Sequence, residues 1–257
     1  MKTTPSDDLF PINARRTTNF WHAIYKVANF FYIPQLAPFF FRMKVKNRST
    51  MEDYADLAFN AFQKFPFMLL GWRIRPIQIE EEIIKLAKIV KARHPQMLME
   101  IGTARGGTLF LWTRAASDDA TIISLDLPGG EFGGGYSKKR IPYYKSFAVK
   151  QQKIYLIRGN SHDPNLSKKI ERELYGSNVD FLFIDADHTY DGVRQDFEMY
   201  HHLVGKGGII AFHDICPSND KTHGVTQFWN EIKRNYRFEE IIKGKNQYEY
   251  GIGVLYL

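Results

Sequence analysis

The stretch "VDFLFIDADHTYDGVRQDFEMYHHLVGKGGIIAFHD", residues 179–214, decides the fold class. It starts with an apolar run that ends in Asp185 and continues into a segment with apolar residues at helical spacing. A second apolar run follows and ends in His213 and Asp214. Short apolar strands that alternate with amphipathic helices are typical of a parallel sheet covered on both faces. The stretch therefore predicts a strand–helix–strand unit of an α/β domain.

The same alternation continues on both sides of this unit, from about residue 79 to residue 257. The expected strands are 97–101, 120–126, 153–159, 179–185 and 207–214, and the expected helices are 79–93, 106–116, 165–175, 190–204 and one near 224–234. Two further segments, 237–244 and 248–257, lie close together around a short turn. This spacing predicts an antiparallel hairpin at the edge of the sheet.

The chain is predicted to have two parts, a helical N-terminal extension over 1–78 and the α/β domain over 79–257. The net charge of +7 is uneven, because residues 1–50 carry eight Lys or Arg residues and only two Asp residues. The rest of the chain is nearly neutral. A near-neutral main domain is not typical of a nucleic-acid-binding protein, so we expect no nucleic-acid partner.

Residues 17–48 combine aromatic and basic side chains, and two interpretations are open. Apolar residues at helical spacing predict a helix that Pro34 and Pro38 should end. This helix could pack on the main domain, either of the same chain or of a second copy in a homo-oligomer. Alternatively, the segment is an anchor on an anionic membrane, where apolar area and positive charge act together.

The lone cysteine, Cys216, excludes an intrachain disulfide and favours the reducing cytoplasm. A peripheral position at the membrane is the alternative, through residues 17–48. The first 16 residues contain no apolar segment, so we expect no secretory signal. No apolar run approaches the roughly 20 residues that a membrane span needs.

Polar and glycine-rich loops follow the expected strands, where open α/β sheets bind ligands. The first, "EIGTARGGT" (100–108), allows a tight turn at Gly102 and matches neither the dinucleotide nor the P-loop spacing. Glu100 suits a cationic ligand group. Asp126 follows Gly102 by 24 positions, which suits hydrogen bonds from both hydroxyls of a ribose. We expect the glycine-rich stretch 129–135 to be a mobile flap.

The third loop, "RGNSHD" (158–163), offers polar groups for an adenine edge, and Ser161 is our candidate for that contact. His162 is interpreted as a turn or surface residue.

Asp185, His213 and Asp214 end neighbouring strands and could converge as ligands of Mg²⁺, Mn²⁺ or Fe²⁺. His188 lies three residues beyond Asp185, where it could take a proton as a general base. The alternative is that Asp187 and Thr189 only cap a helix and His188 is solvated.

Together these loops resemble class I S-adenosylmethionine-dependent methyltransferases, and more narrowly the cephalosporin-hydroxylase-like branch with its metal-dependent sugar O-methyltransferases. The resemblance covers roughly residues 79–256. It implies a Rossmann-like, doubly wound sheet of seven strands, mostly parallel with an antiparallel C-terminal hairpin. Where those sugar enzymes commonly carry Glu-Asp, this chain has His213-Asp214.

The resemblance also implies roles for individual residues. S-adenosylmethionine would be held by Glu100, Gly102, Thr103, Ala104, Arg105, Gly106, Gly107, Thr108, Asp126, Leu127, Ser161 and Asp185. A divalent metal would be held by Asp185, His213 and Asp214, with His188 and Asp185 as catalytic residues. The expected reaction is methylation of a hydroxyl group on a small molecule or sugar, including a lipid-linked one. The alternatives are a non-catalytic S-adenosylmethionine-binding accessory protein and a metal-dependent hydroxylase-like enzyme on the same fold.

Overall fold

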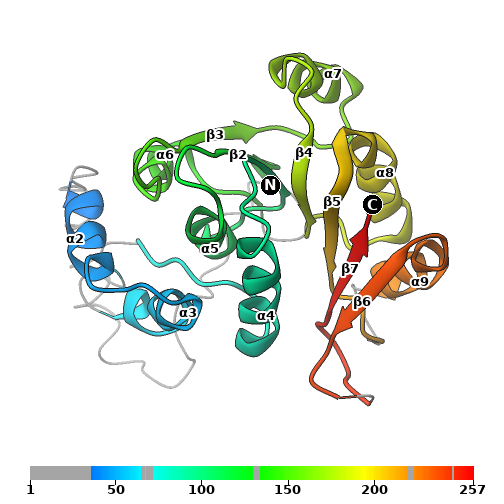
Figure 1. Ribbon diagram of the computed structural model, residues 1–257, viewed down its shortest axis with the longest axis horizontal. Coiled ribbons are helices and arrows are strands. Elements are labelled where there is room, and N and C mark those ends of the chain that lie inside the picture. Colours follow the sequence, from blue (N-terminus) through cyan, green and yellow to red (C-terminus); the bar gives the residue numbers. More distant parts are fainter. Residues whose placement is uncertain (1–35, 65–66, 68–71, 130–133, 219–222, 245) are drawn as a thin grey trace, which may run out of the picture.

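A seven-stranded sheet organises the computed structural model, which describes residues 36–64, 67, 72–129, 134–218, 223–244 and 246–257 (Figure 1). The strands are β1 (Met97–Ile101), β2 (Thr121–Asp126), β3 (Lys153–Arg158), β4 (Val179–Ile184), β5 (Val204–His213), β6 (Arg237–Ile241) and β7 (Ile252–Tyr256). Their order across the sheet is β3-β2-β1-β4-β5-β7-β6. The first five run parallel, and β7 pairs antiparallel with both β5 and β6. The predicted seven-stranded sheet with its C-terminal hairpin is confirmed.

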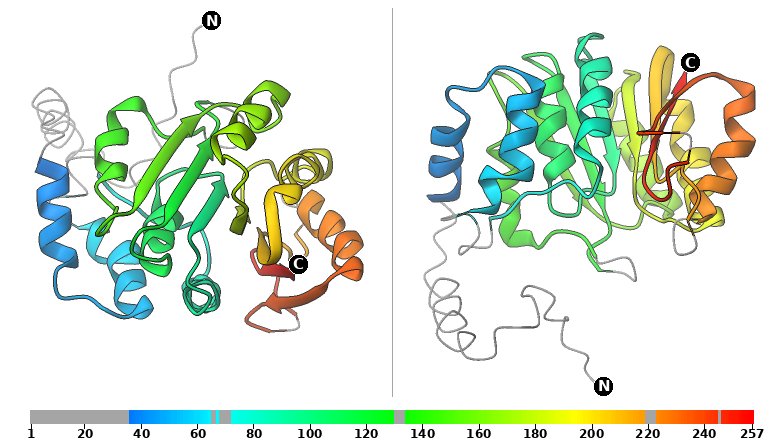
Figure 2. Two further views of the ribbon diagram at one scale, coloured as in Figure 1. Left: turned by 45° about the horizontal axis from the view of Figure 1, so that its top comes forward. Right: turned by 90° about the horizontal axis from the view of Figure 1, so that it is seen from below.

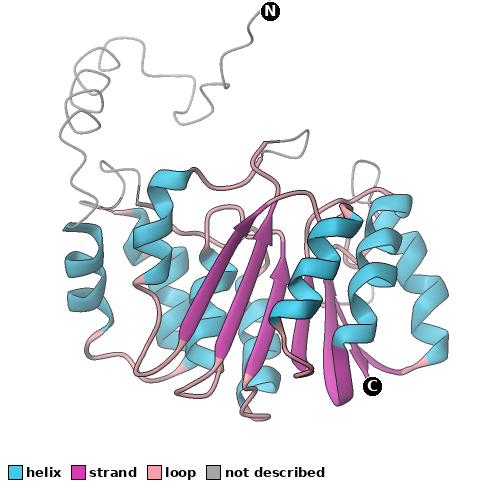
Figure 3. Cartoon of the chain, turned by 90° about the horizontal axis from the view of Figure 1, so that it is seen from above, coloured by secondary structure: helices cyan, strands magenta, loops and turns pink. Residues whose placement is uncertain are grey.

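Helices cover both faces of this sheet (Figure 3). The α-helices are α2 (Leu36–Val45), α3 (Met51–Phe59), α4 (Glu80–Lys91), α5 (Gly107–Ala115), α6 (Ile141–Lys145), α7 (Pro164–Glu173), α8 (Tyr190–Tyr200) and α9 (His223–Ile232). Short 3₁₀ turns are η1 (Ala61–Gln63), η2 (Lys138–Arg140), η3 (His201–Leu203) and η4 (Lys233–Asn235). Each helix expected from residue 79 onward is present, with ends within a few residues of the expected ones.

Two apolar cores lie on the two faces, because successive strand residues point in opposite directions. In β5, for example, Ile209 packs with the core on the side of α4 and α5, whereas Ile210 packs with the core of α7, α8 and α9. Both side chains are fully buried. The near-continuous apolar runs of the central strands are therefore explained by burial on both sides.

The N-terminal elements belong to one of these cores (Figure 2). Phe41 of α2 is 1% exposed and stacks on Phe62 at 5.3 Å, and both rings meet Phe110 of α5 edge-on. Thr50 and Asp53 form a capping box that begins α3. The division of the chain at residues 78 and 79 stays a prediction, but part of the expected extension packs into the core of the sheet domain.

The helix expected upstream of Pro34 lies outside the described residues. Pro38 was expected to end a helix, but it lies in the first turn of α2, where its missing N–H leaves no helical hydrogen bond unmade. The expected flap over 129–135 falls largely on 130–133, which are also outside the described residues. Among the described residues, no helix is long and apolar enough to cross a membrane.

The sheet reverses its order between β1 and β4, and this point decides where a ligand can bind. The chain runs outward from β1 to β2 and β3, then returns to place β4 on the other side of β1. The two strands stay in contact to their ends, since the Asp185 N–H donates to the Ile101 carbonyl at 2.9 Å. Gly102 has a φ of +95°, and a Cβ there would lie 1.8 Å from the Asp185 carbonyl oxygen.

We expect the substitution Gly102→Ala to destabilise the fold by about 3 kcal/mol or more, since it combines an unfavourable φ with a backbone clash. Urea denaturation followed by circular dichroism measures this loss. Gly244→Ala is the matched control, because a Cβ at Gly244 meets nothing within 4 Å. Equal losses in the two variants would mean that the close approach at Gly102 is not a constraint.

Candidate active site

Two adjoining cavities lie beyond the carboxyl ends of the parallel strands, and they share the wall formed by Gly102, Ala104, Asp185 and Ala186. The larger, about 820 Å³, continues along the 75–78 segment and past the end of β5. The smaller, about 140 Å³, continues past the ends of β2 and β3. A ligand in one cavity could therefore touch a ligand in the other at the end of β1.

The smaller cavity collects the residues predicted to hold a nucleoside. Asp126, Leu127 and Ser161 all line it, and so does His162, which was interpreted as a turn or surface residue. Asp126 is 9% exposed, and its carboxylate accepts hydrogen bonds from the backbone N–H groups of Ala104 and Tyr136. Burial raises the pKa of Asp126 to about 6, although these N–H groups act in the opposite direction.

Most residues of the glycine loop line the larger cavity, namely Gly102, Thr103, Ala104, Arg105, Gly107 and Thr108. Gly106 begins α5 with a φ of +77°. Glu100 lines neither cavity, because it lies fully buried beneath the loop and accepts a hydrogen bond from the Trp112 indole at 3.0 Å. Burial raises the pKa of Glu100 to about 8, so below that pH its carboxyl group is largely protonated.

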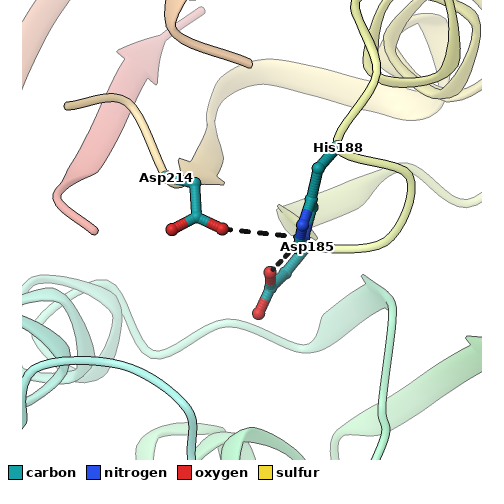
Figure 4. A group of neighbouring side chains, drawn as sticks. All are labelled: Asp185, His188 and Asp214. Atoms are coloured by element: carbon teal, nitrogen blue, oxygen red, sulfur yellow. Dashed lines mark ion pairs between the residues drawn. The ribbon is translucent and has the colours of Figure 1, made fainter. Parts of the chain in front are cut away.

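Asp185, His188 and Asp214 converge in the larger cavity (Figure 4). Asp185 follows β4, Asp214 follows β5, and His188 comes from the loop that leads into α8. The imidazole Nε2 of His188 lies 3.5 Å from Asp185 Oδ1 and 3.6 Å from Asp214 Oδ2. One ligand atom from each residue lies within 4.8 Å of the others, so the group could hold a metal ion.

His213 lies beside this group, though not in it. Its Nδ1 is 3.4 Å from Asp185 Oδ1 and 3.2 Å from Asp214 Oδ2, and neither ring nitrogen has a hydrogen-bond partner among the described residues. As the last residue of β5, His213 points to the same face as Ala211 and lies buried at 4% exposure. The predicted ligands Asp185, His213 and Asp214 are thus close together, but the candidate metal group contains His188. The choice between the histidines stays a prediction.

The acidic pair dominates the electrostatics of both histidines. Burial by itself lowers the pKa of His213, but the carboxylates of Asp185 and Asp214 outweigh it and raise that pKa to about 10. The pKa of His188 is raised in the same way, against its own burial. In return, His213 and His188 hold the pKa of Asp185 well below its ordinary value despite burial. The half-buried carboxylate of Asp185 and the buried carboxylate of Asp214 therefore need positive charge, either from protonated imidazoles or from a bound cation.

Gln78 was not singled out in the sequence but belongs to this site. Its side-chain amide donates to Asp185 Oδ2 at 2.6 Å, and its buried Oε1 has no hydrogen-bond partner among the described residues. Gln78 comes from the irregular segment that precedes α4, 107 positions from Asp185. Gly107 admits this segment, because a Cβ there would lie 2.2 Å from the Pro76 nitrogen. A glutamine in an irregular segment carries no pattern that would have identified it.

The backbone around the larger cavity is strained. Four non-glycine residues that line it have positive φ: Ala104, Asp214, Glu249 and Tyr250. Such conformations cost about 1–3 kcal/mol each and cluster at functional sites. The strain therefore points to the same cavity as the ionisable group.

Thr189 and Asp187 stabilise the start of α8, as the helix-cap interpretation expected. Thr189 caps α8 by accepting from the Gly192 N–H at 3.0 Å, and Asp187 accepts from both the backbone and the hydroxyl of Thr189. His188 is not merely solvated, because it lies within 4 Å of both carboxylates of the candidate group. The cap and the ionisable site therefore coexist in one loop.

Comparison with known proteins identifies the domain. A family model described as "Methyltransferase domain" matches residues 99–215. An uncharacterised protein, R132, of Acanthamoeba polyphaga mimivirus is 31% identical over 166 residues, which are 64% of this chain and 71% of that protein. Caffeoyl-CoA O-methyltransferase 3 of Nicotiana tabacum is 27% identical over 147 residues, 55% of this chain and 54% of that protein. The chain spans between 18% and 71% of the length of these and other curated relatives.

Solved structures show the same fold. The O-methyltransferase from Bacillus cereus, in complex with SAH, superposes with a TM-score of 0.54 at 19% sequence identity. The superposition covers 82% of this chain and 92% of that one. This likeness shows that the chain shares its overall fold with that protein.

Proposed function

The chain belongs to the class I S-adenosylmethionine-dependent methyltransferase family, and from this premise we propose that it methylates a hydroxyl group. The acceptor is a small molecule or a sugar, and a divalent cation assists the reaction. The observation that carries the proposal is the group of Asp185, His188 and Asp214 in the larger cavity, where Asp185 also belongs to the wall shared with the smaller one.

The cofactor is proposed to occupy the smaller cavity with its nucleoside and to extend along Gly102 into the larger one. Asp126 would accept hydrogen bonds from the ribose, and Ser161, which lines the same cavity, would contact the adenine edge. The bound SAH of the Bacillus cereus enzyme supports this choice of cofactor. The methyl group would then lie near Asp185, beside the acceptor.

The residues of the acidic group fit a hard divalent cation. They provide two carboxylates and one imidazole with ligand atoms close enough to share an ion. The negative charge of the carboxylates favours a bound cation. A bound divalent cation lowers the pKa of a coordinated hydroxyl group and orients it. Mg²⁺ is the leading candidate, with Mn²⁺ or Fe²⁺ as alternatives.

We propose His188 as the general base. This role requires that His213, Asp185 and Asp214 hold the cation, because a metal-bound imidazole nitrogen cannot take a proton. Methyl transfer forms a bond from the acceptor oxygen to the methyl carbon as the carbon–sulfur bond breaks, and the hydroxyl proton must leave. The imidazole of His188 is 23% exposed and lies in the same cavity as the acidic pair, so it can receive this proton. Gln78 would hold Asp185 in place through its hydrogen bond.

Calorimetric titration of S-adenosylmethionine into the full chain tests the cofactor. We expect binding that persists in EDTA, since the cation serves the acceptor, and that weakens about tenfold to a hundredfold in Asp126→Ala. Asp119→Ala is the control, because Asp119 is an exposed carboxylate outside both cavities. No binding by the wild type would overturn the methyltransferase assignment.

Titration of Mn²⁺ into EDTA-treated protein tests the cation, with free Mn²⁺ followed by electron paramagnetic resonance. We expect Asp185→Asn to weaken binding at least about tenfold, because one charged ligand is lost. Asp191→Asn, on the exposed first turn of α8, should bind like the wild type. A parallel comparison of His188→Gln with His213→Gln tells which imidazole is a ligand.

Unchanged Mn²⁺ affinity in Asp185→Asn would contradict a cation at this site. A catalyst should also lose methyl transfer to catechol and sugar acceptors in this variant, whereas a non-catalytic accessory protein has no turnover to lose. Product analysis of the same reactions separates methylation from the hydroxylase-like alternative, because the mass added differs.

We also propose that α2 contacts an anionic membrane. Its exposed side carries an apolar stripe of Leu36, Phe39 and Met43, which are 41%, 57% and 61% exposed. Arg42, Lys44 and Lys46 are exposed in and just after the same helix, and α2 contains no acidic residue. Apolar area next to positive charge suits the interface of a bilayer with anionic lipid.

We expect Phe39→Ser combined with Met43→Ser to weaken binding to vesicles of phosphatidylcholine and phosphatidylserine about tenfold or more, since two apolar side chains are lost from the contact. Vesicle sedimentation measures the bound fraction. Tyr175→Ser, at an 88% exposed aromatic residue near the end of α7, is the control. Binding that is the same in the double variant and the wild type would exclude α2 as the contact.

A further inference from the structure

The smaller cavity contains a histidine that the proposed function does not use. His162 lies in the loop between β3 and α7, lines this cavity, and has a side chain that is 19% exposed. Its backbone N–H donates to the side chain of Asn160 at 3.0 Å. The next contact along the loop comes from α8, where the Tyr200 hydroxyl donates to the Ser161 carbonyl at 2.8 Å. These bonds fix the loop, so His162 is held in one place at the cavity.

The imidazole of His162 is oriented by two acceptors on α8. Its Nε2 lies 3.2 Å from the carbonyl oxygen of Gly192 and 3.2 Å from Oδ1 of Asp196. A carbonyl and a carboxylate oxygen cannot donate, so Nε2 must carry a hydrogen atom. Of the two ring nitrogens, Nδ1 is therefore the one that can contact a ligand.

Asp196 is a buried charge behind the cavity. Its side chain is 0% exposed, and its oxygens find no other hydrogen-bond partner among the described residues. A carboxylate in this position is costly unless a positive charge accompanies it. A protonated His162 supplies that charge at 3.2 Å. The ion pair therefore favours the imidazolium form of a residue that faces the nucleoside cavity.

The other polar groups around His162 act in the same direction. Asp196 raises the pKa of His162 above its ordinary value, against the effect of burial. The charge of Asp187, from the loop before α8, and the Gly192 carbonyl raise it further. Asp126 lines the opposite part of the same cavity. A positively charged donor thus lies in a cavity whose other ionisable groups are carboxylates.

We propose that His162 binds the adenine ring of the cofactor as an imidazolium, with Nδ1–H as the donor, and that Asp196 is the positioning residue that keeps it charged and oriented. This inference rests on the proposed function, because it assumes the cofactor nucleoside in the smaller cavity. The ring nitrogens of adenine that are not bound to the ribose accept hydrogen bonds. A charged donor suits them, since such bonds are roughly twice as strong as neutral ones.

Calorimetric titration of SAH into the full chain tests the contact. We expect His162→Ala to weaken binding about tenfold or more, because a charge-assisted hydrogen bond is lost. His202→Ala is the matched control. This exposed histidine also lies near a carboxylate, 3.9 Å from Glu171, but lines neither cavity. Equal SAH affinity in His162→Ala and the wild type would overturn the proposal.

A second ligand locates the contact on the cofactor. The compound 5′-methylthioadenosine keeps the adenine and the ribose but lacks the amino and carboxylate groups of SAH. We expect His162→Ala to weaken its binding by the same factor as that of SAH. A loss seen with SAH alone would assign His162 to the amino acid part of the cofactor and contradict an adenine contact.

The role of Asp196 is tested by the titration of His162, followed through its imidazole proton resonances. In Asp196→Asn, the pKa of His162 should fall toward its ordinary value, because the charge that raises it is removed. An unchanged titration would exclude Asp196 as the positioning residue. Thermal unfolding verifies that this nearly isosteric variant folds.

The pH dependence of SAH affinity separates charge from shape. In the wild type, affinity should decline as the pH rises through the raised pKa of His162, because the donor form is lost. The decline should move to lower pH in Asp196→Asn and be absent in His162→Gln, whose amide does not titrate. Protonation of Asp126 near pH 6 should affect all variants alike. A wild-type affinity without the alkaline decline would contradict the imidazolium.

These measurements separate this inference from the proposed function. A wild-type chain that binds no SAH counts against the methyltransferase assignment. A wild-type chain that binds SAH, together with a His162→Ala variant that binds it equally well, counts against this inference alone. The His162 variants keep the test decisive even if Asp196→Asn does not fold, because His162 lies in a partly exposed loop.

Discussion

The contact between the ends of β1 and β4 is the constraint on which the rest of the site depends. These strands are adjacent because the sheet reverses its order there, and Gly102 lets the backbone turn away from β1 directly against the Asp185 carbonyl. Any side chain at this position would force the two strands apart. The reversal opens the crevice, and the close approach sets Asp185 where both cavities meet.

The lining of the larger cavity comes from distant parts of the chain. Asp185 and Asp214 follow β4 and β5 and pair with two imidazoles. The segment before α4 and the glycine loop form another part of the lining, and Gly107 allows these two to touch. Segments that are far apart in the sequence therefore meet around one cavity.

Helix α2 has one side buried in the core and one apolar side exposed to solvent. One side of α2 contributes Phe41 to the core, while the other side exposes Phe39 and Met43. Burial of the first side fixes the helix on the domain, because an isolated helix of 10 residues would be marginal in water. The exposed side is thereby presented as a rigid surface, at the part of the molecule where positive charge is concentrated.

The sequence by itself determined the alternation of strands and helices, the C-terminal hairpin and the loops that carry Gly102, Asp126 and Asp185. Those features depend on local periodicity and on turn residues, which are readable without long-range contacts. Only the tertiary structure decided that Gln78 reaches Asp185, that His188 and His213 both lie within 4 Å of the two carboxylates, and that Glu100 lies beneath the loop. These facts depend on which face a strand-end side chain takes and on contacts across more than 100 positions, and periodicity contains neither.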